Sequence, residues 1–496
     1  MTPSVTQNDN TQTDQKRAVP LGAASKLMRV CAVGGGLFLI ALLLRSSSGQ
    51  RVLLALSVGI ICFLLMVRTP RVGLPLIAVY LAFLGGLRHW LLPIFGWVTN
   101  DPLVLVGPAL VFPYFLNLFV GRRLHRDTRL GYLLLWLLGI MALEILNPLQ
   151  GGLVVGIAGA LFYIVPLLWY HVARDQCSLP TLEAVFRVVV ATAVLGALYG
   201  LYQTWFGFSE GERAWLKLTI PFVPNFNVGN GLLRPFSFFN SVAEYVTWLT
   251  IADVVLWAAV LHRNRLALVP FLFVLLAIFL SGVRGATVNT LATCTVLWAV
   301  QGATVRSWLP RGVFALVLAG VGLVWSLQQV QQVDFGGNAQ NLLSHQEQGI
   351  TDPTDPGKST AGAHTTLLLN GYLQGFRNPI GIGLGGTTLA ASKFGVSGND
   401  TEVDTSNMFV SLGLLGGPLY LIVFGFTLVI ALRYWHFTRS LVALQIVAVL
   451  SVVQGHWLSG GMYVVVMLLW TCIGALDSAQ KKLPAMAISL AWKRPV

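Results

Sequence analysis

Charged residues are scarce in this chain. Only 10% of its 496 residues are Asp, Glu, Lys or Arg, and 55% are hydrophobic, whereas a soluble protein carries roughly 25% charged residues. This composition excludes a soluble globular protein. Apolar runs long enough to cross a hydrocarbon core of about 30 Å recur from residue 30 to residue 475. The sequence therefore predicts an all-α polytopic membrane protein.

Cysteine is also rare, and the common metal-binding motifs are absent. Four of the five cysteines lie in apolar runs, and the fifth, Cys177, lies in a short loop. This placement implies neither a disulfide framework nor a cysteine-based metal site. The chain has no HExxH, CxxC or DxD cluster, so a metal mechanism has no support and we expect no cofactor.

The N-terminus does not look like a cleaved signal peptide. Residues 1–28 are polar and lack a short charged start, and the first apolar run ends at Leu44-Arg45 without a small-residue cleavage pattern. We therefore interpret that run as a retained helix. The net charge of +13 does not indicate nucleic acid, because the Lys and Arg residues mark loop ends, as orientation signals do.

Hydropathy predicts about 14 transmembrane helices. They cover residues 30–44, 52–67, 72–87, 102–120, 130–147, 151–170, 182–206, 237–261, 266–281, 286–303, 312–330, 407–432, 440–455 and 461–476. With the N-terminus in the cytoplasm, basic loops such as 121–129 and 262–265 also face the cytoplasm, where Lys and Arg are enriched. The same rule places the C-terminal tail inside.

Two longer segments then lie on the extracytoplasmic side, at 207–236 and 331–406. Within the second, residues 359–376 have apolar residues near helical spacing after a Ser-Thr start, which indicates an amphipathic helix lying along the membrane or capping a cavity. The predicted organisation is a cytoplasmic tail, two blocks of spans separated by the large loop, and a second tail. Their bounds are 1–28, 29–330, 331–406, 407–476 and 477–496.

Three arginines lie near the outer membrane surface on this map: Arg234, Arg284 and Arg377. Arg284 stands in a Gly-flanked break between two apolar runs, where a charge costs a few kcal/mol unless it faces water or a partner. Guanidinium groups bind phosphate oxygens in a bidentate way, so the three arginines favour an anionic ligand such as a lipid pyrophosphate. The ordinary alternative is that each one snorkels to lipid headgroups or marks the end of a span.

The glycine-rich stretch GIGLGG (381–386) is a poor nucleotide fingerprint. The strand–turn–helix context and the downstream acid are missing, and the loop is extracytoplasmic. We interpret it as a flexible re-entrant loop whose backbone N–H groups can still contact a phosphate.

Histidines supply candidates for a general base. His364 lies in the amphipathic segment, and His456 lies in the turn before the last span. Neutral imidazole is suited to taking a proton from a sugar hydroxyl. His345, in the flexible polar part of the large loop, ranks below both. The alternative for each is a hydrogen-bonded structural histidine.

The acidic candidates are fewer. Asp404 directly precedes a span, with Glu402 two residues earlier, while Glu144 and Glu244 lie near outer span ends and can pair with the arginines. A solvated or salt-bridged role explains all of these except Asp404, which we keep as a candidate.

These residues, in their order, resemble the O-antigen ligase and Wzy-type polymerase superfamily of bacterial inner-membrane enzymes. The resemblance spans most of residues 70–475 and rests on short motifs. They are FLGGLRHWLLP (83–93), RPFSFFNSVAEY (234–245), SGVRGA (281–286), RNPIGIGLG (377–385) and NMFVSLGLLGGPLYL (407–421).

The resemblance implies a glycosyltransferase that uses an undecaprenyl-pyrophosphate-linked glycan as donor, without metal or nucleotide. The acceptor is a second lipid-linked glycan for a polymerase, or lipid A core for a ligase. Membrane lipids and other polysaccharide-assembly proteins are the further partners that it implies, and nucleic acid is not one. Arg234 and Arg284 match the arginines that hold the donor pyrophosphate, and Arg377 and His456 join them as candidate substrate-binding residues.

One departure from the family concerns the base. Ligases often carry a His-Asn-type pair just before the span that opens with GLLG, and here that position reads DTSN (404–407). The missing histidine disfavours a ligase acting on lipid A core. We expect His364 as the base first and Asp404 second, and a polymerase as the function.

Two other functions stay open. A transporter, either a lipid-linked glycan flippase or a carrier of bicarbonate or another anion, is favoured by Asp253 within a span. A carrier is expected to concentrate charged features near mid-membrane, whereas the polar residues here collect on the outer face. A non-catalytic scaffold for a polysaccharide assembly complex is the third interpretation.

Overall fold

The computed structural model describes residues 47–481, apart from residues 99, 222, 230, 303, 331, 356–358, 395–398, 400, 402 and 457. Within these residues the fold is almost wholly helical, with a single antiparallel hairpin of β1 (Asn227–Gly229) and β2 (Leu232–Leu233). The predicted all-α class is confirmed for this part of the chain. The predicted tail 1–28, the first span 30–44 and residues 482–496 of the second tail lie outside the described residues.

The helices follow one another along the chain with short connections. They are α2 (Ser47–Arg68), α3 (Pro70–Trp90), α4 (Leu92–Phe95), η1 (Pro102–Leu105), α5 (Val106–Val120), α6 (Arg129–Glu144), η2 (Pro148–Gln150), α7 (Leu153–Gln176), α8 (Leu179–Phe206), α9 (Glu210–Thr219), η3 (Pro224–Phe226), α10 (Val242–Leu261), η4 (Arg265–Ala267), α11 (Leu268–Leu280), α12 (Arg284–Val300), α13 (Val305–Val330), α14 (Gly337–Thr351), α15 (Ala361–Arg377), α16 (Leu389–Lys393), α17 (Asp404–Thr438), α18 (Leu441–Val452), η5 (Val453–Gly455) and α19 (Tyr463–Lys481).

Among the described residues, nine helices are long and apolar enough to cross a membrane. They are α2, α3, α5 with η1, α7, α8, α10, α13, α17 and α19. Two further apolar helices, α11 with η4 and α18 with η5, are shorter. The helices α6 and α12 coincide with the predicted spans 130–147 and 286–303 but have only 16 and 17 residues. These helices are those of a multi-pass membrane protein. The number of 14 spans stays a prediction.

Polar caps explain where several of these helices begin. The first backbone N–H groups of every helix have no partner within the helix. A polar side chain just before the helix can accept the N–H group three residues further on and so pair one of them. Ser209 does this for α9 in a full capping box with Glu212. The same cap is formed by Thr128, Ser178, Ser241 and Ser440.

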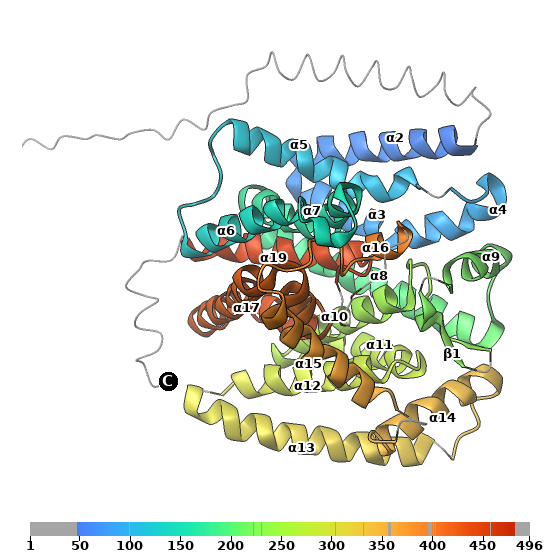
Figure 1. Ribbon diagram of the computed structural model, residues 1–496. Coiled ribbons are helices and arrows are strands. Elements are labelled where there is room, and N and C mark those ends of the chain that lie inside the picture. Colours follow the sequence, from blue (N-terminus) through green and yellow to red (C-terminus); the bar gives the residue numbers. More distant parts are fainter. Residues whose placement is uncertain are drawn as a thin grey trace, which may run out of the picture.

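The core lies around α10 and α19. In each of these helices, 83% of the most apolar window is buried, whereas none of the corresponding window of α13 is buried. Figure 1 shows α13 at the edge of the bundle, next to α12. A helix that is apolar all round and sits at the edge is suited to face lipid.

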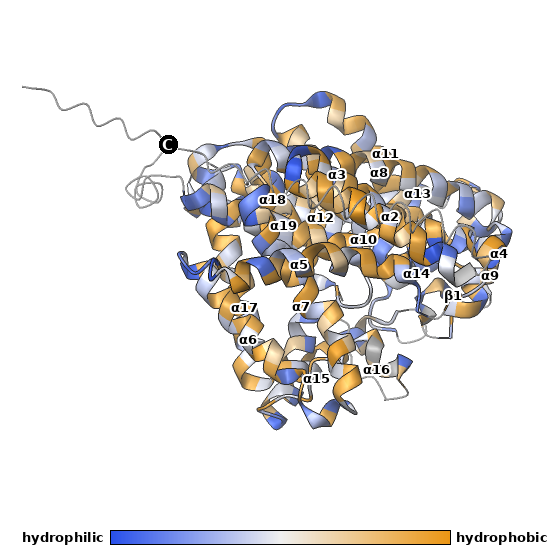
Figure 2. Ribbon diagram, turned by 90° about the horizontal axis from the view of Figure 1, so that it is seen from above, coloured by the Kyte–Doolittle hydropathy of each residue, from blue (hydrophilic) through white to orange (hydrophobic). Residues whose placement is uncertain are grey.

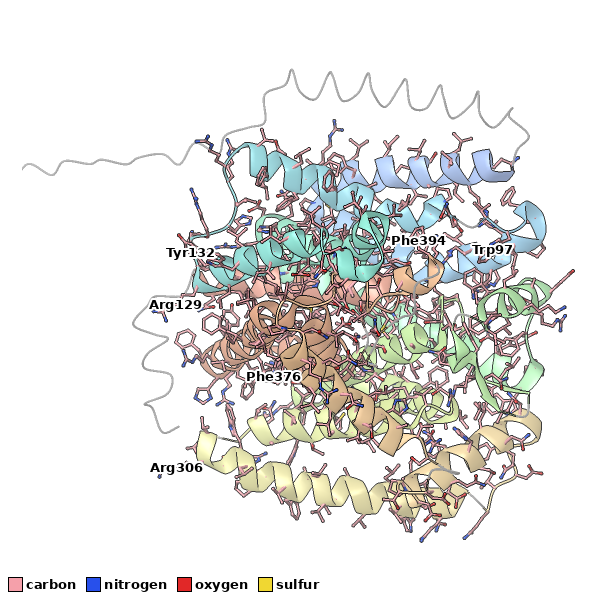
Figure 3. The ribbon with its side chains drawn as sticks, in the orientation of Figure 1. Trp97, Arg129, Tyr132, Arg306, Phe376 and Phe394 are labelled. Carbon is pink, nitrogen blue, oxygen red and sulfur yellow. The ribbon has the colours of Figure 1, made fainter. Side chains whose placement is uncertain are left out.

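Parts of the two segments predicted to lie outside, 207–236 and 331–406, gather at one end of the bundle. Figure 1 shows α4, α9, β1 and α14 on the right, while Figure 3 shows Arg129 and Arg306 at the opposite end from Trp97. Hydrophobic residues dominate the helices in between, and hydrophilic ones collect mainly at the ends (Figure 2). We call the end with α9, the hairpin and α14 the loop end; its assignment to the outside of the cell remains a prediction.

The helix α15 enters the bundle beside α17. A Cβ added at Gly371 would touch Ser406, one at Gly375 would touch Phe409, and the Leu414 N–H donates to the carbonyl of Pro379. The residue numbers rise together in both partners, so α15 runs parallel to α17, beginning near the first residues of α17. The face of α15 turned away from α17 is apolar and exposed, which suits contact with lipid. Its exposed residues include Leu369 and Leu373.

The glycine-rich loop returns from the inner end of α15 and is buried. The N–H groups of Ile382 and Gly383 donate to the carbonyls of Val410 and Ser411, and those of the next two residues donate to the Glu144 carbonyl and to Gln150. The prediction that this loop is flexible is wrong, because its backbone is hydrogen-bonded within the bundle. Its re-entry into a membrane stays a prediction, and we keep the name re-entrant loop for the segment from Gly381 to Thr388. These four N–H groups are engaged within the protein, which contradicts the expectation that they can contact a phosphate.

Candidate functional site

Arg234 is held at the loop end by the β1–β2 hairpin. It directly follows β2, and its backbone N–H donates to the carbonyl of Phe226 at 2.9 Å. Its Nη1 donates to the carbonyl of Asn225 at 2.9 Å, and its Nε donates to the carbonyl of Gly282 at 3.3 Å. The guanidinium thus bridges the hairpin and the turn before α12, with its Nη2 left for a third partner.

Arg284 is the first residue of α12, and the turn before it requires glycine. Gly282 has a φ of 72°, and a Cβ there would lie 2.9 Å from the Leu342 side chain. The break between two apolar runs therefore has a structural cause, because the chain must turn sharply while α14 packs over it. The turn also brings the carbonyl of Gly282 to Arg234, so it links the two arginines.

The two guanidinium groups converge on one nitrogen of His345 in α14. The Nη2 of Arg284 lies 3.0 Å from His345 Nε2, and the Nη2 of Arg234 lies 3.4 Å from the same atom (both donors point to a single acceptor). The contacts require His345 to carry its proton on Nδ1. An imidazole nitrogen has only one lone pair to offer, so it is a poor match for two cations. We call these three residues the arginine–histidine cluster.

The charges of the cluster affect one another. Burial and the positive charges of Arg284 and Arg234 lower the pKa of His345 to about 4. Burial and the neighbouring Arg284 lower the pKa of Arg234 to about 10. Both shifts have the direction expected of cations packed against one another in a partly dehydrated place. A group with negative charge and several lone pairs, such as a phosphate, relieves this repulsion.

Helix α14 covers the cluster closely. A Cβ at Gly349 would overlap the guanidinium of Arg284, so the backbone of α14 passes directly over that group. One turn earlier, Gln346 donates to the Thr287 hydroxyl of α12 at 2.9 Å. This face of α14 therefore packs against α12 and does not face lipid or solvent.

His456 holds α10 and α12 together. Its Nε2 lies 3.1 Å from the side-chain nitrogen of Asn289 in α12, and its Nδ1 lies 3.2 Å from the hydroxyl of Thr247 in α10. Asn289 also donates to the Val452 carbonyl at 2.8 Å. Since Arg284 begins the same helix α12, the structure connects His456 to the cluster through the backbone of that helix.

Asp404 is buried at the start of α17 in a hydrogen-bonded chain. It accepts from the Ser459 hydroxyl at 2.7 Å and from the Ser459 N–H at 3.2 Å, and its own N–H donates to the His456 carbonyl. The Ser459 hydroxyl lies 2.8 Å from that of Tyr163, which in turn lies 3.0 Å from Thr387 in the re-entrant loop. These contacts tie α17, α7 and the turn before α19 together.

His364 and Arg377 lie on α15, apart from the helix that covers the cluster. Both are exposed, His364 in the first turn and Arg377 in the last. Because α15 runs parallel to α17, Arg377 lies beside a part of α17 that is about 10 Å further along that helix than Asp404, at 1.5 Å per residue. The structure thus brings together two of the three predicted arginines, Arg234 and Arg284, and places the third on α15.

The segment around His345 is not the flexible loop that its polar sequence predicts. Residues 337–351 form α14, so the reason for ranking His345 below the other histidines is wrong. A helical pattern was present in that segment, since its buried residues recur at the spacing of one helix face. They are Ala339, Leu342, Leu343, Gln346 and Gly349.

The described residues contain no group of three or more His, Cys, Asp or Glu side chains placed to hold a metal ion. The described cysteines, Cys62, Cys177, Cys294 and Cys472, are buried free thiols. What the loop end does assemble is a pair of guanidinium groups with a neutral nitrogen acceptor between them, which can bind an anion. Comparison of the chain with protein-family models gives no match, and comparison with curated proteins gives none either.

Proposed function

We propose that this protein is a glycosyltransferase that polymerises a bacterial surface polysaccharide, joining undecaprenyl-pyrophosphate-linked repeat units at the outer face of the inner membrane. The observation that carries the proposal is the convergence of Arg234 and Arg284 on one nitrogen of His345. Two guanidinium forks beside the ends of transmembrane helices suit the pyrophosphate of a membrane lipid.

The cluster supports a defined division of labour. The hydroxyl oxygen of the acceptor attacks the anomeric carbon of the donor while the bond from that carbon to the pyrophosphate breaks. The polyprenyl pyrophosphate leaves with the electron pair of that bond on its oxygen, and Arg234 and Arg284 stabilise the negative charge that grows there. Once the pyrophosphate replaces the imidazole between the guanidinium groups, His345 Nε2 is released to accept the proton of the acceptor hydroxyl.

This assignment places His345 ahead of His364 as the base. His345 touches both arginines, whereas His364 lies on α15 with Arg377. Asp404 and His456 then act as positioning residues, because their hydrogen bonds join helices of the scaffold. Arg377 is proposed as a further contact to substrate from the re-entrant helix.

The test is reconstitution. Purified protein in liposomes receives a short lipid-pyrophosphate-linked repeat unit, and the products are separated on a gel. We expect a ladder of longer glycans that Arg284→Ala reduces by about 10²–10³-fold, as the removal of a charge-stabilising donor does. Arg284→Lys should restore little, because lysine lacks the bidentate fork.

Two matched controls sharpen this test. Arg213→Ala removes an exposed arginine of α9 at the same end of the bundle and should leave the ladder intact. His345→Ala and His364→Ala separate the two candidate bases, and loss of elongation in His364→Ala alone would overturn the role of His345. No elongation by the wild-type protein with any lipid-linked glycan would overturn the proposal itself.

Two alternatives have their own readouts. A ligase gives one transfer to a lipid A core acceptor and no ladder. A transporter is favoured by Asp253, whose carboxylate oxygens have no hydrogen-bond partner among the described residues, and by the break of α17 at Gly413, since interrupted helices are common in carriers. Protected movement of substrate or bicarbonate across the bilayer, without elongation, identifies that function.

A further inference from the structure

Helix α14 closes over the two arginines to which the proposed function assigns the donor pyrophosphate. Its backbone at Gly349 lies against the Arg284 guanidinium, and its His345 lies between Arg284 and Arg234. A pyrophosphate has several charged oxygens to place, and each guanidinium fork binds two oxygens side by side. In the structure, α14 therefore occupies the position that the ligand needs.

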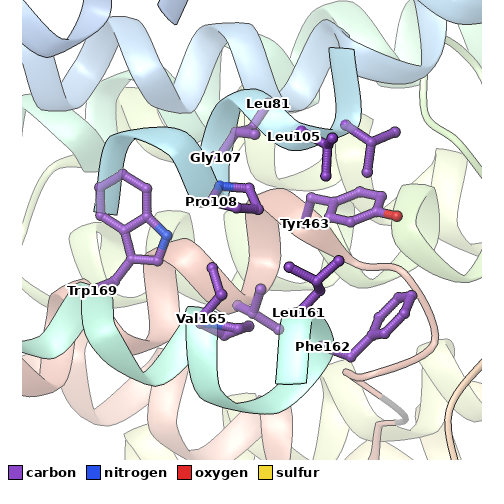
Figure 4. A pocket seen from close by; sticks show the side chains of 12 residues that line it. Leu81, Leu105, Gly107, Pro108, Leu161, Phe162, Val165, Trp169 and Tyr463 are labelled. Atoms are coloured by element: carbon purple, nitrogen blue, oxygen red, sulfur yellow. The ribbon is translucent and has the colours of Figure 1, made fainter. Parts of the chain in front are cut away.

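A pocket on the opposite side of the bundle does not offer another way in. It is formed by α3, η1, α5, α7 and α19, and Figure 1 shows α5 and α14 on opposite sides of the bundle. Figure 4 shows its lining, in which side chains such as Leu81, Leu161 and Trp169 are uncharged. Such a lining does not attract a pyrophosphate, so the way to the arginines is at α14 itself.

The polar contacts under α14 are imperfect. Gln346 donates to the Thr287 hydroxyl at 2.9 Å, but its side-chain oxygen is buried and has no hydrogen-bond partner among the described residues. His345 offers the lone pair of one nitrogen to two cations, at 3.0 and 3.4 Å. A buried acceptor without a donor destabilises the arrangement that contains it. Both features lower the cost of lifting α14 from α12.

A pair of glycines joins α14 to a fixed part of the chain. Gly336 and Gly337 have φ values of 74° and 45°, in the left-handed region that favours glycine, and a Cβ on either one would meet nothing within 4 Å. Just before them, the Phe335 carbonyl accepts the indole N–H of Trp205 in α8 at 3.1 Å. A change in the dihedral angles of the glycine pair therefore moves α14 while Phe335 stays on α8.

We propose that α14 is a lid that turns about Gly336 and Gly337 and opens to admit the donor pyrophosphate to Arg234 and Arg284. The inference rests on the proposed function, which assigns the pyrophosphate to these arginines. The bound anion replaces His345 as the partner of both guanidinium groups, so it holds the lid away from α12. The displaced imidazole stays on the lid beside the ligand, where the proposed reaction needs a base.

Cysteine labelling of the lid tests the inference, with inorganic pyrophosphate as the probe. Leu343 lies on the buried face of α14, and Gln348 lies on its exposed face. Leu343→Cys should react slowly with a maleimide in the free, detergent-purified protein. At saturating pyrophosphate it should react roughly tenfold faster and approach the rate of Gln348→Cys. Mass spectrometry of the α14 peptide measures the labelling at this site alone.

Controls show whether the change belongs to the lid. Leu216→Cys, buried in α9 at the same end of the bundle, should keep its rate when pyrophosphate is added. In Arg284→Ala, pyrophosphate should no longer accelerate the labelling of Leu343→Cys. Thermal unfolding reports whether each variant folds, and Ala339→Cys, on the same buried face of α14, is the second reporter if Leu343→Cys does not.

The hinge gives a prediction without any ligand. An alanine at position 337 is strained in the closed lid, because a φ of 45° suits an L residue poorly. Gly337→Ala should therefore raise the labelling of Leu343→Cys in the free protein by roughly tenfold. Gly362→Ala, in the first turn of α15 with nothing within 4 Å of an added Cβ, is the matched control and should leave the labelling unchanged.

The outcomes separate this inference from the proposed function. Binding of pyrophosphate without faster labelling of the lid overturns the lid alone, and so does acceleration that persists in Arg284→Ala. If calorimetry shows no binding of inorganic pyrophosphate, the lipid-linked repeat unit in liposomes is the second probe, and unchanged labelling with it also overturns the lid. No elongation with any lipid-linked glycan defeats the proposed function, and the lid for a donor pyrophosphate falls with it.

Discussion

Arg234, Arg284 and His345 come from three segments far apart in the chain, and their contacts explain why a neutral histidine lies between two cations. The contacts of Arg234 are to two carbonyl oxygens and the imidazole nitrogen. These acceptors position the guanidinium without neutralising it. The positive charge of Arg234 is therefore not cancelled by these contacts, and His345 lies where an anion between the two arginines would bind.

At the residue scale, anion binding should depend on pH through His345. Its pKa is lowered to about 4 by burial and by Arg284 and Arg234, so the imidazole is neutral above that pH. A bound anion offsets the two arginines and raises this pKa toward its ordinary value of about 6.5. Binding then takes up a proton between about pH 4 and 6.5, so affinity should rise as pH falls through that window, by at most about tenfold per unit.

Sulfate is the suitable probe, because its charge does not change over this range. The measurement is its dissociation constant for the detergent-purified protein from pH 7.5 to pH 4.5, for wild type and His345→Gln. A pH dependence that is the same in both proteins would show that His345 does not take up the proton.

At the scale of elements, α15, the re-entrant loop and the first turns of α17 form one unit. The loop lies against α17 where that helix is broken, and Gly159 of α7 meets Gly385 of the loop so closely that a Cβ would lie 2.5 Å from the Gly385 backbone. Small residues permit this approach of backbone to backbone within a membrane protein. The glycines of the loop are therefore explained by packing and not by a ligand.

The break of α17 gives a sharp stability test. Gly413 has a φ of 59°, and a Cβ there would lie 2.1 Å from the Pro379 carbonyl oxygen. Gly413→Ala should therefore lower the free energy of unfolding by about 1–3 kcal/mol or more through backbone strain and this overlap. Thermal unfolding in detergent measures the change.

Gly425→Ala is the control within the same helix. Gly425 has nothing within 4 Å of an added Cβ, and replacing glycine by alanine in a helix stabilises by about 0.5–1 kcal/mol. Equal unfolding temperatures for the two variants would contradict the strained turn at Gly413.

At the scale of the whole molecule, the charged side chains divide between the two ends of the bundle. The arginine–histidine cluster lies at the loop end, and so does Asp101, which binds Arg51 and Arg88 at 2.7 and 3.2 Å. At the other end, Arg174 and Lys481 both bind Asp127, at 2.6 Å each. The positive-inside pattern of the loops predicts that the second end faces the cytoplasm. It then predicts that the loop end faces the outer surface, where we propose that lipid-linked glycans are joined.

Cysteine labelling tests this orientation. Arg213→Cys at the loop end should react with a membrane-impermeant maleimide in intact spheroplasts, whereas Arg306→Cys at the start of α13 should react only after the membrane is permeabilised. The unmodified chain gives the background, and its four described cysteines are buried. Labelling of Arg306→Cys in intact spheroplasts would invert the topology and remove the cluster from the outer surface.

The sequence by itself determined that the chain is a helical membrane protein and where most of its long apolar helices lie. The predicted span 182–206, for example, corresponds to α8 (Leu179–Phe206). The physical reason is local: a run of about 20 apolar residues must form a helix in lipid, whatever its neighbours are. Arg284 was likewise visible as a candidate, since a charge in an apolar sequence stands out without knowledge of the fold.

Only the tertiary structure decided what surrounds that charge. His345 lies 61 residues from Arg284 and 111 from Arg234, and no pattern of hydropathy or spacing reports a contact over such distances. The tertiary structure likewise showed that N–H groups of the GIGLGG loop are hydrogen-bonded within the protein, and that Arg377 lies in the last turn of α15 rather than beside Arg234 and Arg284. These contacts depend on which helices pack together, and that is decided by the shapes of buried faces across the whole chain.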